Sequence, residues 1–329
     1  MIIKLMISDF VVRGRYLTRE WYHVMRDLID RHGWRHLETQ DLLSEPLSFR
    51  DRIRQRCGGV TPDVVLFWEA YDLVTSVFEQ LSKENFCVAI FSEDLHWFRA
   101  EAQKAKTAAL NVADVILASY APVFDRFFPA AAATKPVVWV PHAASPEFML
   151  PLNESAQNVI FLSGMINNCY PLRQRLKSLA VNRDLHIVEH PHPGYHCNHD
   201  HQTSAAVGAG YARRINAARA SFTDSSKFKY VLAKFFEIPA TGSLLVGDAT
   251  IEGQLSRLGF APRVHYIPVS DATLEDELFN ILDARNHADL DQVRVQGQLL
   301  VRTRHKISDR SKLIDDACTS REQALVDHF

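Results

Sequence analysis

The chain has 329 residues, a length that favours two domains at roughly 150 residues each. Hydrophobic residues make up 47% and charged residues 23%, and 13 Gly with 14 Pro exclude collagen-like and low-complexity chains. Lys and Arg total 37 against 39 Asp and Glu, so a net charge of -2 offers no broad basic surface for nucleic acid. We therefore predict no nucleic-acid partner, and any anion must be bound locally.

The cysteines and the apolar runs indicate the cellular compartment of the protein. The five cysteines are scattered, without a C-x-x-C pair, which argues against a disulfide scaffold and for a reducing compartment. The N-terminal run MIIKLMISDF lacks the features of a signal peptide. No apolar stretch is long enough to predict a transmembrane segment. We expect a cytoplasmic protein and leave peripheral contact with the inner face of the membrane open.

Short apolar runs alternate with amphipathic stretches through the first half, a pattern typical of parallel strands joined by crossover helices. Strands are predicted at residues 2–7, 64–68, 87–91, 115–118 and 137–140. Helices are predicted at residues 18–32, 73–81 and 98–112. We expect a Rossmann-like domain over residues 1–145.

Residues 143–155 contain two prolines and little periodicity, which places the connection between domains there. A second α/β series follows, with strands predicted at 159–163, 186–188, 243–246 and 264–267 and helices at 171–179, 273–282 and 290–306. We expect a second Rossmann-like domain over residues 156–310. A last helix at 311–329 is expected to pack back on the first domain.

The segment 225–248 carries the most informative pattern. The apolar face of a predicted helix consists of Phe228, Val231, Leu232, Phe235 and Phe236. This helix is expected to end at Pro239, which puts Glu237 in the last turn or in the loop after it. A surface glutamate beside lysines on a solvated helix face is the alternative interpretation.

Three segments share their order and spacing with one known family. Residues 138–144 (VWVPHAA) form a strand and a turn. Residues 161–164 (FLSG) precede Tyr170 and Arg173, and residues 234–242 (KFFEIPATG) lead into an apolar strand. The second and third segments resemble the donor-binding half of nucleotide-sugar glycosyltransferases of the GT-B fold, and most closely the CgeB-like branch. Residues 138–144 resemble the strand and turn that precede the crossing between domains in that group.

The resemblance implies a fold and a reaction. Two Rossmann-like domains are expected to face each other across a cleft, with the acceptor in the first domain and the donor in the second. The implied reaction moves a sugar from a nucleoside-diphosphate-sugar to a hydroxyl of a glycan, lipid-linked or protein acceptor. The family generally works without a bound metal or another cofactor. Closure about a hinge at 145–155 would exclude water.

The resemblance also assigns donor-binding residues. Glu237 matches the second glutamate of a paired-glutamate motif, whose two carboxylate oxygens accept hydrogen bonds from the ribose hydroxyls. Thr241 and Gly242 follow it, and a residue without Cβ lets the backbone approach the nucleotide. Tyr230 stands seven positions before Glu237, where the sugar-contacting first glutamate would fall. We expect Lys229 or Tyr230 to take that role.

The diphosphate needs fixed positive charge, because negative charge grows on the leaving group as the glycosidic bond breaks. Arg173 and Lys234 are the candidates, and Gly164 belongs to the glycine loop of the resemblance.

Titratable residues follow strands of the first half, where open α/β sheets bind ligands. Asp94 and His96 come after the strand at 87–91 and are candidates for the general base that activates a sugar hydroxyl. The alternative is that Asp94 caps the next helix and His96 packs on a tryptophan. Asp9 and Gly14 are assigned to the cleft, in a loop after the first strand that would face the donor diphosphate. Glu69 is assigned to the acceptor cleft, with an exposed acid at a helix start as the alternative.

Histidines are concentrated in one loop. The segment 186–201 contains His186, His190, His192, His196, His199 and His201, with Cys197 and Asp200. Prolines between these residues stiffen the loop, and no H-E-x-x-H or paired C-x-x-C spacing occurs, so no metal is predicted. We place His192 near the cleft.

Three alternatives to a glycosyltransferase stay open. An epimerase or hydrolase of nucleotide sugars shares the fold, which does not fix the reaction. The missing first glutamate allows a catalytically inert module that binds a nucleotide sugar or glycan. A metal protein organised around the histidine loop is the third.

Overall fold

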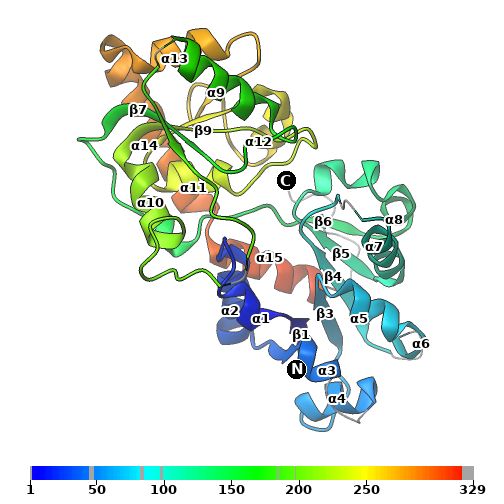
Figure 1. The fold of residues 1–329 in the computed structure, drawn as a ribbon. Coiled ribbons are helices and arrows are strands. Elements are labelled where there is room, and N and C mark those ends of the chain that lie inside the picture. Colours follow the sequence, from blue (N-terminus) through cyan, green and yellow to red (C-terminus); the bar gives the residue numbers. More distant parts are fainter. Residues whose placement is uncertain are drawn as a thin grey trace. The chain divides into compact units, whose positions relative to one another are not determined.

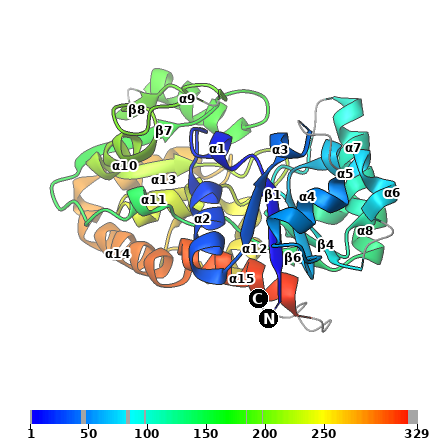
Figure 2. The ribbon, with the colours of Figure 1, turned by 90° about the horizontal axis from the view of Figure 1, so that it is seen from below.

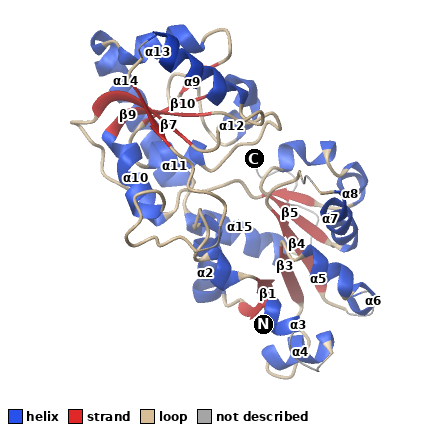
Figure 3. Ribbon diagram, viewed as in Figure 1, coloured by secondary structure: helices blue, strands red, loops and turns tan. Residues whose placement is uncertain are grey.

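The computed structural model describes residues 2–43, 48–81, 85–96, 99–183, 185–196 and 198–320. Contacts divide these residues into two units. Unit 1 comprises residues 2–14, 21–141 and 308–320, and unit 2 comprises residues 15–20 and 142–307. In each unit helices flank a sheet (Figure 3).

The sheet of unit 1 is parallel and has the order β2-β1-β3-β4-β5-β6 (Figure 1). Its strands are β1 (Lys4–Ser8), β2 (Arg35–Glu38), β3 (Val64–Trp68), β4 (Cys87–Ser92), β5 (Val115–Ala118) and β6 (Val137–Trp139). The two central strands β3 and β4 are almost entirely buried, as expected where helices cover both faces. Edge strand β2, with the sequence RHLE, lacked an apolar run and escaped prediction.

The helices of unit 1 include one from the end of the described chain. They are α1 (Phe10–Arg13), α2 (Glu20–His32), α3 (Thr39–Leu43), α4 (Phe49–Arg56), α5 (Tyr71–Ser76), α6 (Phe78–Leu81), α7 (Ala100–Val112), α8 (Pro129–Thr134) and α15 (Ile307–Thr319). Figure 2 shows α15 beside β1, where the Lys4 ammonium lies 2.6 Å from an Asp315 carboxylate oxygen. Residues 321–329 of the predicted last helix lie outside the described residues.

The sheet of unit 2 is also parallel, with the order β11-β10-β9-β7-β8. Its strands are β7 (Gln157–Ser163), β8 (Ile187–His190), β9 (Ala218–Thr223), β10 (Leu244–Asp248) and β11 (Ile267–Val269). The predicted strand at 264–267 is thus displaced toward the C-terminus, and β9 was not predicted. Both sheets confirm the predicted α/β fold class.

Helices complete the core of unit 2. They are α9 (Pro171–Arg183), α10 (Gly208–Ala217), α11 (Lys234–Ala240), α12 (Glu252–Arg257), α13 (Leu274–Leu282) and α14 (His287–Arg304). Leu176 of α9 and Leu278 of α13 pack with Ile160 and Val246 from the sheet. No described helix combines the length and hydropathy needed to cross a membrane.

The predicted helix before Pro239 is wrong over residues 228–233. Lys229 has φ of +62°, a left-handed backbone that an α-helix cannot contain. Helix α11 begins only at Lys234 and continues through Pro239 to Ala240. Pro239 has no backbone N–H to donate to the Phe235 carbonyl, and the helix ends one residue later at Ala240.

Candidate functional site

The candidate site lies where the order of strands in unit 2 reverses. From β7 the chain passes to β8 on one side, and β9 then pairs on the other side of β7. Open α/β sheets bind ligands at the carboxyl ends of the strands beside such a reversal. Gly164 follows β7 at this edge, and Asp224 follows β9.

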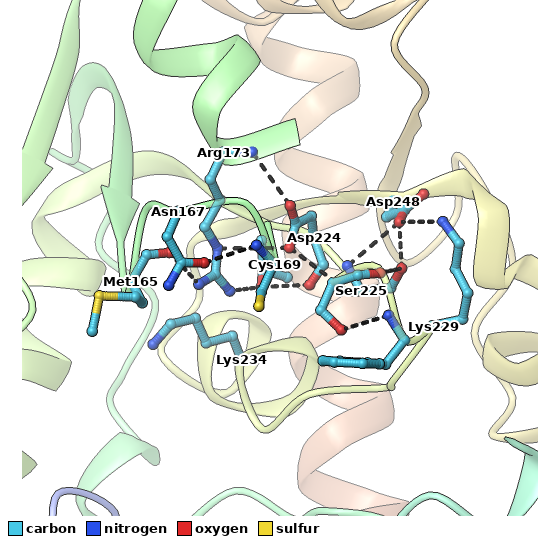
Figure 4. Close-up of polar contacts among 12 residues, drawn as sticks. Met165, Asn167, Cys169, Arg173, Asp224, Ser225, Lys229, Lys234 and Asp248 are labelled. Carbon is cyan, nitrogen blue, oxygen red and sulfur yellow. Dashed lines mark hydrogen bonds and ion pairs between the residues drawn. The ribbon is translucent and has the colours of Figure 1, made fainter. Parts of the chain in front are cut away.

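Two cationic side chains converge on Gly164. This glycine has φ of +94°, and a Cβ built on it would lie 2.7 Å from Arg173 Nη1 and 3.1 Å from Lys234 Cε. A side chain at this position would therefore displace both residues. Figure 4 shows both cations, with Asp224 joined to Arg173. The structure thus brings together three residues that the sequence predicted to bind the donor.

Arg173, in the first turn of α9, is held by its neighbours. Its guanidinium donates to the Met165 carbonyl at 3.1 Å and to the Thr223 hydroxyl at 3.3 Å. The Asp224 carboxylate lies 3.8 Å from Arg173 Nε and accepts from the Arg173 backbone N–H at 3.3 Å. Burial raises the pKa of Asp224, and the charge of Arg173 opposes that shift.

Lys234 occupies the start of α11. Its ammonium donates to the Tyr211 hydroxyl at 2.8 Å and lies 4.0 Å from a Glu237 carboxylate oxygen. Burial lowers the pKa of Lys234, but Tyr211 and Glu237 outweigh burial and the pKa ends above its ordinary value. The side chain therefore stays cationic at neutral pH.

Glu237 is 5% exposed, so the surface interpretation of this residue is wrong. Burial raises its pKa, Lys234 opposes the shift, and the nearby Glu20 carboxylate adds to it. Glu20 accepts from the His142 ring at 2.7 Å, so two buried acids and two bases lie in one region of unit 2. A buried carboxylate next to a cation is a suitable acceptor for neutral hydroxyl donors.

Lys229 and Tyr230, the predicted substitutes for the first glutamate, have partners within the chain. The Lys229 ammonium donates to the Thr250 hydroxyl at 2.7 Å and lies 3.7 Å from an Asp248 oxygen. The Tyr230 ring is 2% exposed and stacks on Phe228. Contact of either residue with a sugar stays a prediction.

Thr241 and Gly242 form the turn between α11 and β10. The Thr241 hydroxyl donates to the Ile238 carbonyl at 2.7 Å. Gly242 has φ of +84°, and a Cβ on it would lie 2.8 Å from Gln298 Nε2 and 3.2 Å from Leu152 Cα. Packing within the unit is thus sufficient reason for this glycine, and its approach to a nucleotide stays a prediction.

His192, in the histidine loop, lies within electrostatic reach of the two cations. Burial, followed by the charges of Lys234 and Arg173, lowers its pKa to about 4, so the ring is neutral. It accepts from the Gly194 N–H at 3.0 Å. Among the described residues no three His, Cys, Asp or Glu side chains are arranged to hold a metal, and Cys197 lies outside those residues.

In unit 1 the structure gathers charged residues at the carboxyl edge of the sheet. Arg13 pairs with Glu69 and lies 3.2 Å from a Glu93 oxygen. Glu69 has φ of +51°, and its carboxylate accepts from the Glu93 N–H at 3.2 Å and the Tyr71 hydroxyl at 3.4 Å. The interpretation of Glu69 as an exposed acid is therefore wrong.

The remaining acceptor-side candidates are more exposed. Asp94 has an exposed side chain, and its carbonyl accepts from the Lys106 ammonium. His96 is half-buried and Asp9 is exposed, while Gly14 ends α1 with an ordinary helical backbone. Their roles toward an acceptor stay predictions. Burial lowers the pKa of Lys106 to about 8, although the nearby Glu69, Asp94 and Glu93 oppose this shift. Unit 1 therefore contains an amine of reduced basicity close to three acids.

Comparison with solved structures places the fold. Sucrose-phosphate synthase from Thermosynechococcus elongatus aligns with a TM-score of 0.61 at 11% identity, over 95% of this chain and 97% of that one. HepE of Anabaena, in complex with UDP and glucose, aligns at 0.56 and 9%, over 95% and 98%. An α-glucosyltransferase in complex with UDP-glucose and DNA aligns at 0.58 and 11%, over 97% and 99%. The fold is that of the GT-B glycosyltransferases. No family model and no curated protein matches the chain.

Within this GT-B fold, sequence reasoning missed the residues that support the cations. Asp224 follows β9, which was not predicted, so its position at the sheet edge could not be foreseen. Tyr211 lies on α10, another unpredicted element. The ion pairs of Arg13 could not be predicted, because its partners Glu69 and Glu93 are distant in the sequence.

Proposed function

We propose that this protein is a glycosyltransferase that moves a sugar from a nucleoside-diphosphate-sugar to a hydroxyl group on a glycan, lipid-linked or protein acceptor. The observation that carries the proposal is the convergence of Arg173 and Lys234 on Gly164, with buried Glu237 4.0 Å from Lys234. This arrangement lies at the carboxyl edge of the unit 2 sheet, beside the reversal of strand order where open α/β sheets bind ligands.

The residues of unit 2 divide the work of holding a donor. Arg173 and Lys234 offer fixed positive charge to the diphosphate, which becomes more negative as the bond to the sugar breaks. Glu237 offers two acceptor oxygens to the ribose hydroxyls. Because two protein cations supply this charge, we propose transfer without a bound metal ion or another cofactor.

UDP-sugars are the first donors to test. The HepE structure contains UDP and glucose, and the α-glucosyltransferase structure contains UDP-glucose. On the acceptor side we propose Asp94 or His96 as the general base, with Asp9, Gly14 and Glu69 of the same unit as acceptor contacts. His192 belongs to unit 2 and is proposed separately as a substrate contact. The CgeB-like branch, the cytoplasmic location and contact with a membrane face remain predictions from the sequence.

The test measures release of nucleoside diphosphate and transfer of labelled sugar, from UDP-, GDP- and dTDP-sugars offered with a panel of hydroxyl acceptors. We expect turnover with one donor class and a loss of about 100-fold or more in Arg173→Ala. Arg175→Ala is the matched control, since Arg175 lies on the same helix with its side chain 46% exposed. We expect it to keep wild-type turnover.

Two outcomes would contradict the proposal. Turnover that Arg173→Ala leaves unchanged would show that these cations do not hold the donor. Donor binding without turnover on any acceptor would favour the inert binding module. That alternative rests on Tyr230, which stands in the place of the first glutamate.

A further inference from the structure

Tyr211 lies at the centre of a hydrogen-bonded group that the site described above does not yet use. Its hydroxyl accepts from the Lys234 ammonium at 2.8 Å and shares a second hydrogen bond, 2.6 Å long, with the Ser163 hydroxyl. The three side chains come from α10, from the start of α11 and from the end of β7. Tyr211 is 8% and Ser163 is 3% exposed, so bulk water has little access to either hydroxyl.

The protons of this group can be counted. The ammonium of Lys234 is a donor only, so the Tyr211 oxygen is the acceptor in that bond. One hydroxyl proton lies in the bond between Tyr211 and Ser163. Whichever hydroxyl donates there, the other keeps a proton for which the described residues provide no acceptor. A buried donor without an acceptor is costly, which indicates that a ligand accepts this proton.

The position of the group defines the ligand chemistry. Ser163 directly precedes Gly164, the residue on which Arg173 and Lys234 converge. A ligand beside Gly164 therefore meets two cations and one neutral hydroxyl donor. A group with several negatively charged oxygens satisfies all three, whereas a single neutral hydroxyl does not.

We propose that the hydroxyl pair of Tyr211 and Ser163 donates a hydrogen bond to an oxygen of the diphosphate of the sugar donor. This inference rests on the proposed function. When the bond between the sugar carbon and the diphosphate oxygen breaks, the electron pair stays on that oxygen. The hydroxyl keeps its proton, and the hydrogen bond strengthens as charge grows on the diphosphate. The pair then acts beside Arg173 and Lys234 as a neutral donor.

The experiment is a calorimetric titration with UDP and with uridine, because UDP carries the charge of the leaving group and uridine carries none. Tyr211→Phe removes the hydroxyl and keeps the ring, which packs edge-on against Phe148 and tilted against His190. We expect the variant to bind UDP about 10-fold more weakly and uridine within about 2-fold of wild type, as for one hydrogen bond to a charged group. A role in packing alone would weaken both ligands equally.

Tyr266→Phe is the matched control, because this buried tyrosine of unit 2 directly precedes β11, whereas the proposed site lies where strands of the same parallel sheet end. We expect it to bind both ligands as the wild type does. Ser163→Ala is the second variant. Whichever of Tyr211→Phe and Ser163→Ala loses more UDP affinity identifies the hydroxyl that donates to the diphosphate. The inference is contradicted when every folded variant of the pair binds UDP as the wild type does. Failure of the wild type to bind UDP, GDP or dTDP would instead contradict the proposed donor site itself.

Discussion

At the scale of single residues, the candidate site consists of charges that are buried and only partly neutralised. Asp224 balances Arg173 at 3.8 Å, whereas Glu237 lies 4.0 Å from Lys234. Both acids have raised pKa values because burial outweighs the neighbouring cation. Such an arrangement costs stability without a ligand, as functional sites commonly do.

We predict that Glu237→Gln stabilises the protein at neutral pH. Because burial raises the pKa of Glu237, the folded state holds this proton more tightly than the unfolded chain. The free energy of unfolding therefore falls as pH rises from the ordinary carboxyl pKa through the folded-state pKa. Glutamine has no such titration, so Tm at pH 7.5 should rise by about 2–4 °C, the shift that about 1 kcal/mol produces in a domain of this size.

The control for this prediction is pH itself. Melting curves of both proteins at pH 4 should lie closer together than at pH 7.5, because the wild-type carboxyl is then protonated in either state. A difference in Tm that is independent of pH would contradict the electrostatic account of Glu237.

At the scale of elements, the loop after β7 depends on a glycine that no other residue replaces. We predict that Gly164→Ala lowers stability by about 1–2 kcal/mol, since φ of +94° is strained for a residue with a Cβ. It should also weaken UDP binding about 10-fold, because the added Cβ displaces Arg173 and Lys234. Chemical denaturation and calorimetry measure the two effects.

Gly253→Ala is the control for the loop. Nothing lies within 4 Å of a Cβ built at Gly253, which belongs to α12. Alanine is a better helix former than glycine, so stability should stay equal or rise and UDP affinity should not change. Equal effects of both substitutions would show that the loop at Gly164 has no special role.

The elements that the sequence allowed us to predict are those with uniform apolar runs. Strands at 64–68 and 115–118 coincide with β3 and β5. Strand β9 (ARASFT) escaped because polar residues interrupt it, although all six residues are buried. Its polar groups find distant partners: Arg219 lies 2.5 Å from Asp291, and the Ser221 hydroxyl lies 2.9 Å from that of Ser243. Pairings of this kind cannot be inferred from local sequence.

In the molecule as a whole, two short segments belong to a different unit from the residues next to them in the sequence. Residues 15–20 belong to unit 2, where the His199 N–H donates to the Arg15 carbonyl at 3.0 Å. Residues 308–320 belong to unit 1. The assignment of residues 15–20 to unit 2 depends on contacts between residues about 180 positions apart in the sequence. Hydrophobic periodicity is a local pattern and could not predict it.

Asp315 ties the last described helix to the sheet of unit 1, and we predict that Asp315→Ala destabilises that unit by about 2–3 kcal/mol. Its carboxylate accepts from the Lys4 ammonium at 2.6 Å and the Trp34 indole N–H at 2.7 Å, and both donors lose their partner. The control is Asp316→Ala, which removes an exposed pair with Lys312. Chemical denaturation checks the loss, which Asp316→Ala should not reproduce.

The affinity for UDP should be the same in Asp315→Ala as in the wild type at a temperature where both are folded, because the proposed donor residues all belong to unit 2. A large loss of UDP affinity in this variant would contradict the assignment of donor binding to unit 2 alone.

The role of Glu237 in donor binding is tested by calorimetric titration of UDP into the wild type and into Glu237→Ala. We predict saturable binding to the wild type and an affinity about 10- to 100-fold lower in the variant, as expected for the loss of hydrogen bonds to a buried carboxylate. Equal affinities in the two proteins, or no binding to the wild type by UDP or by any other nucleoside diphosphate, would contradict a donor site at Glu237.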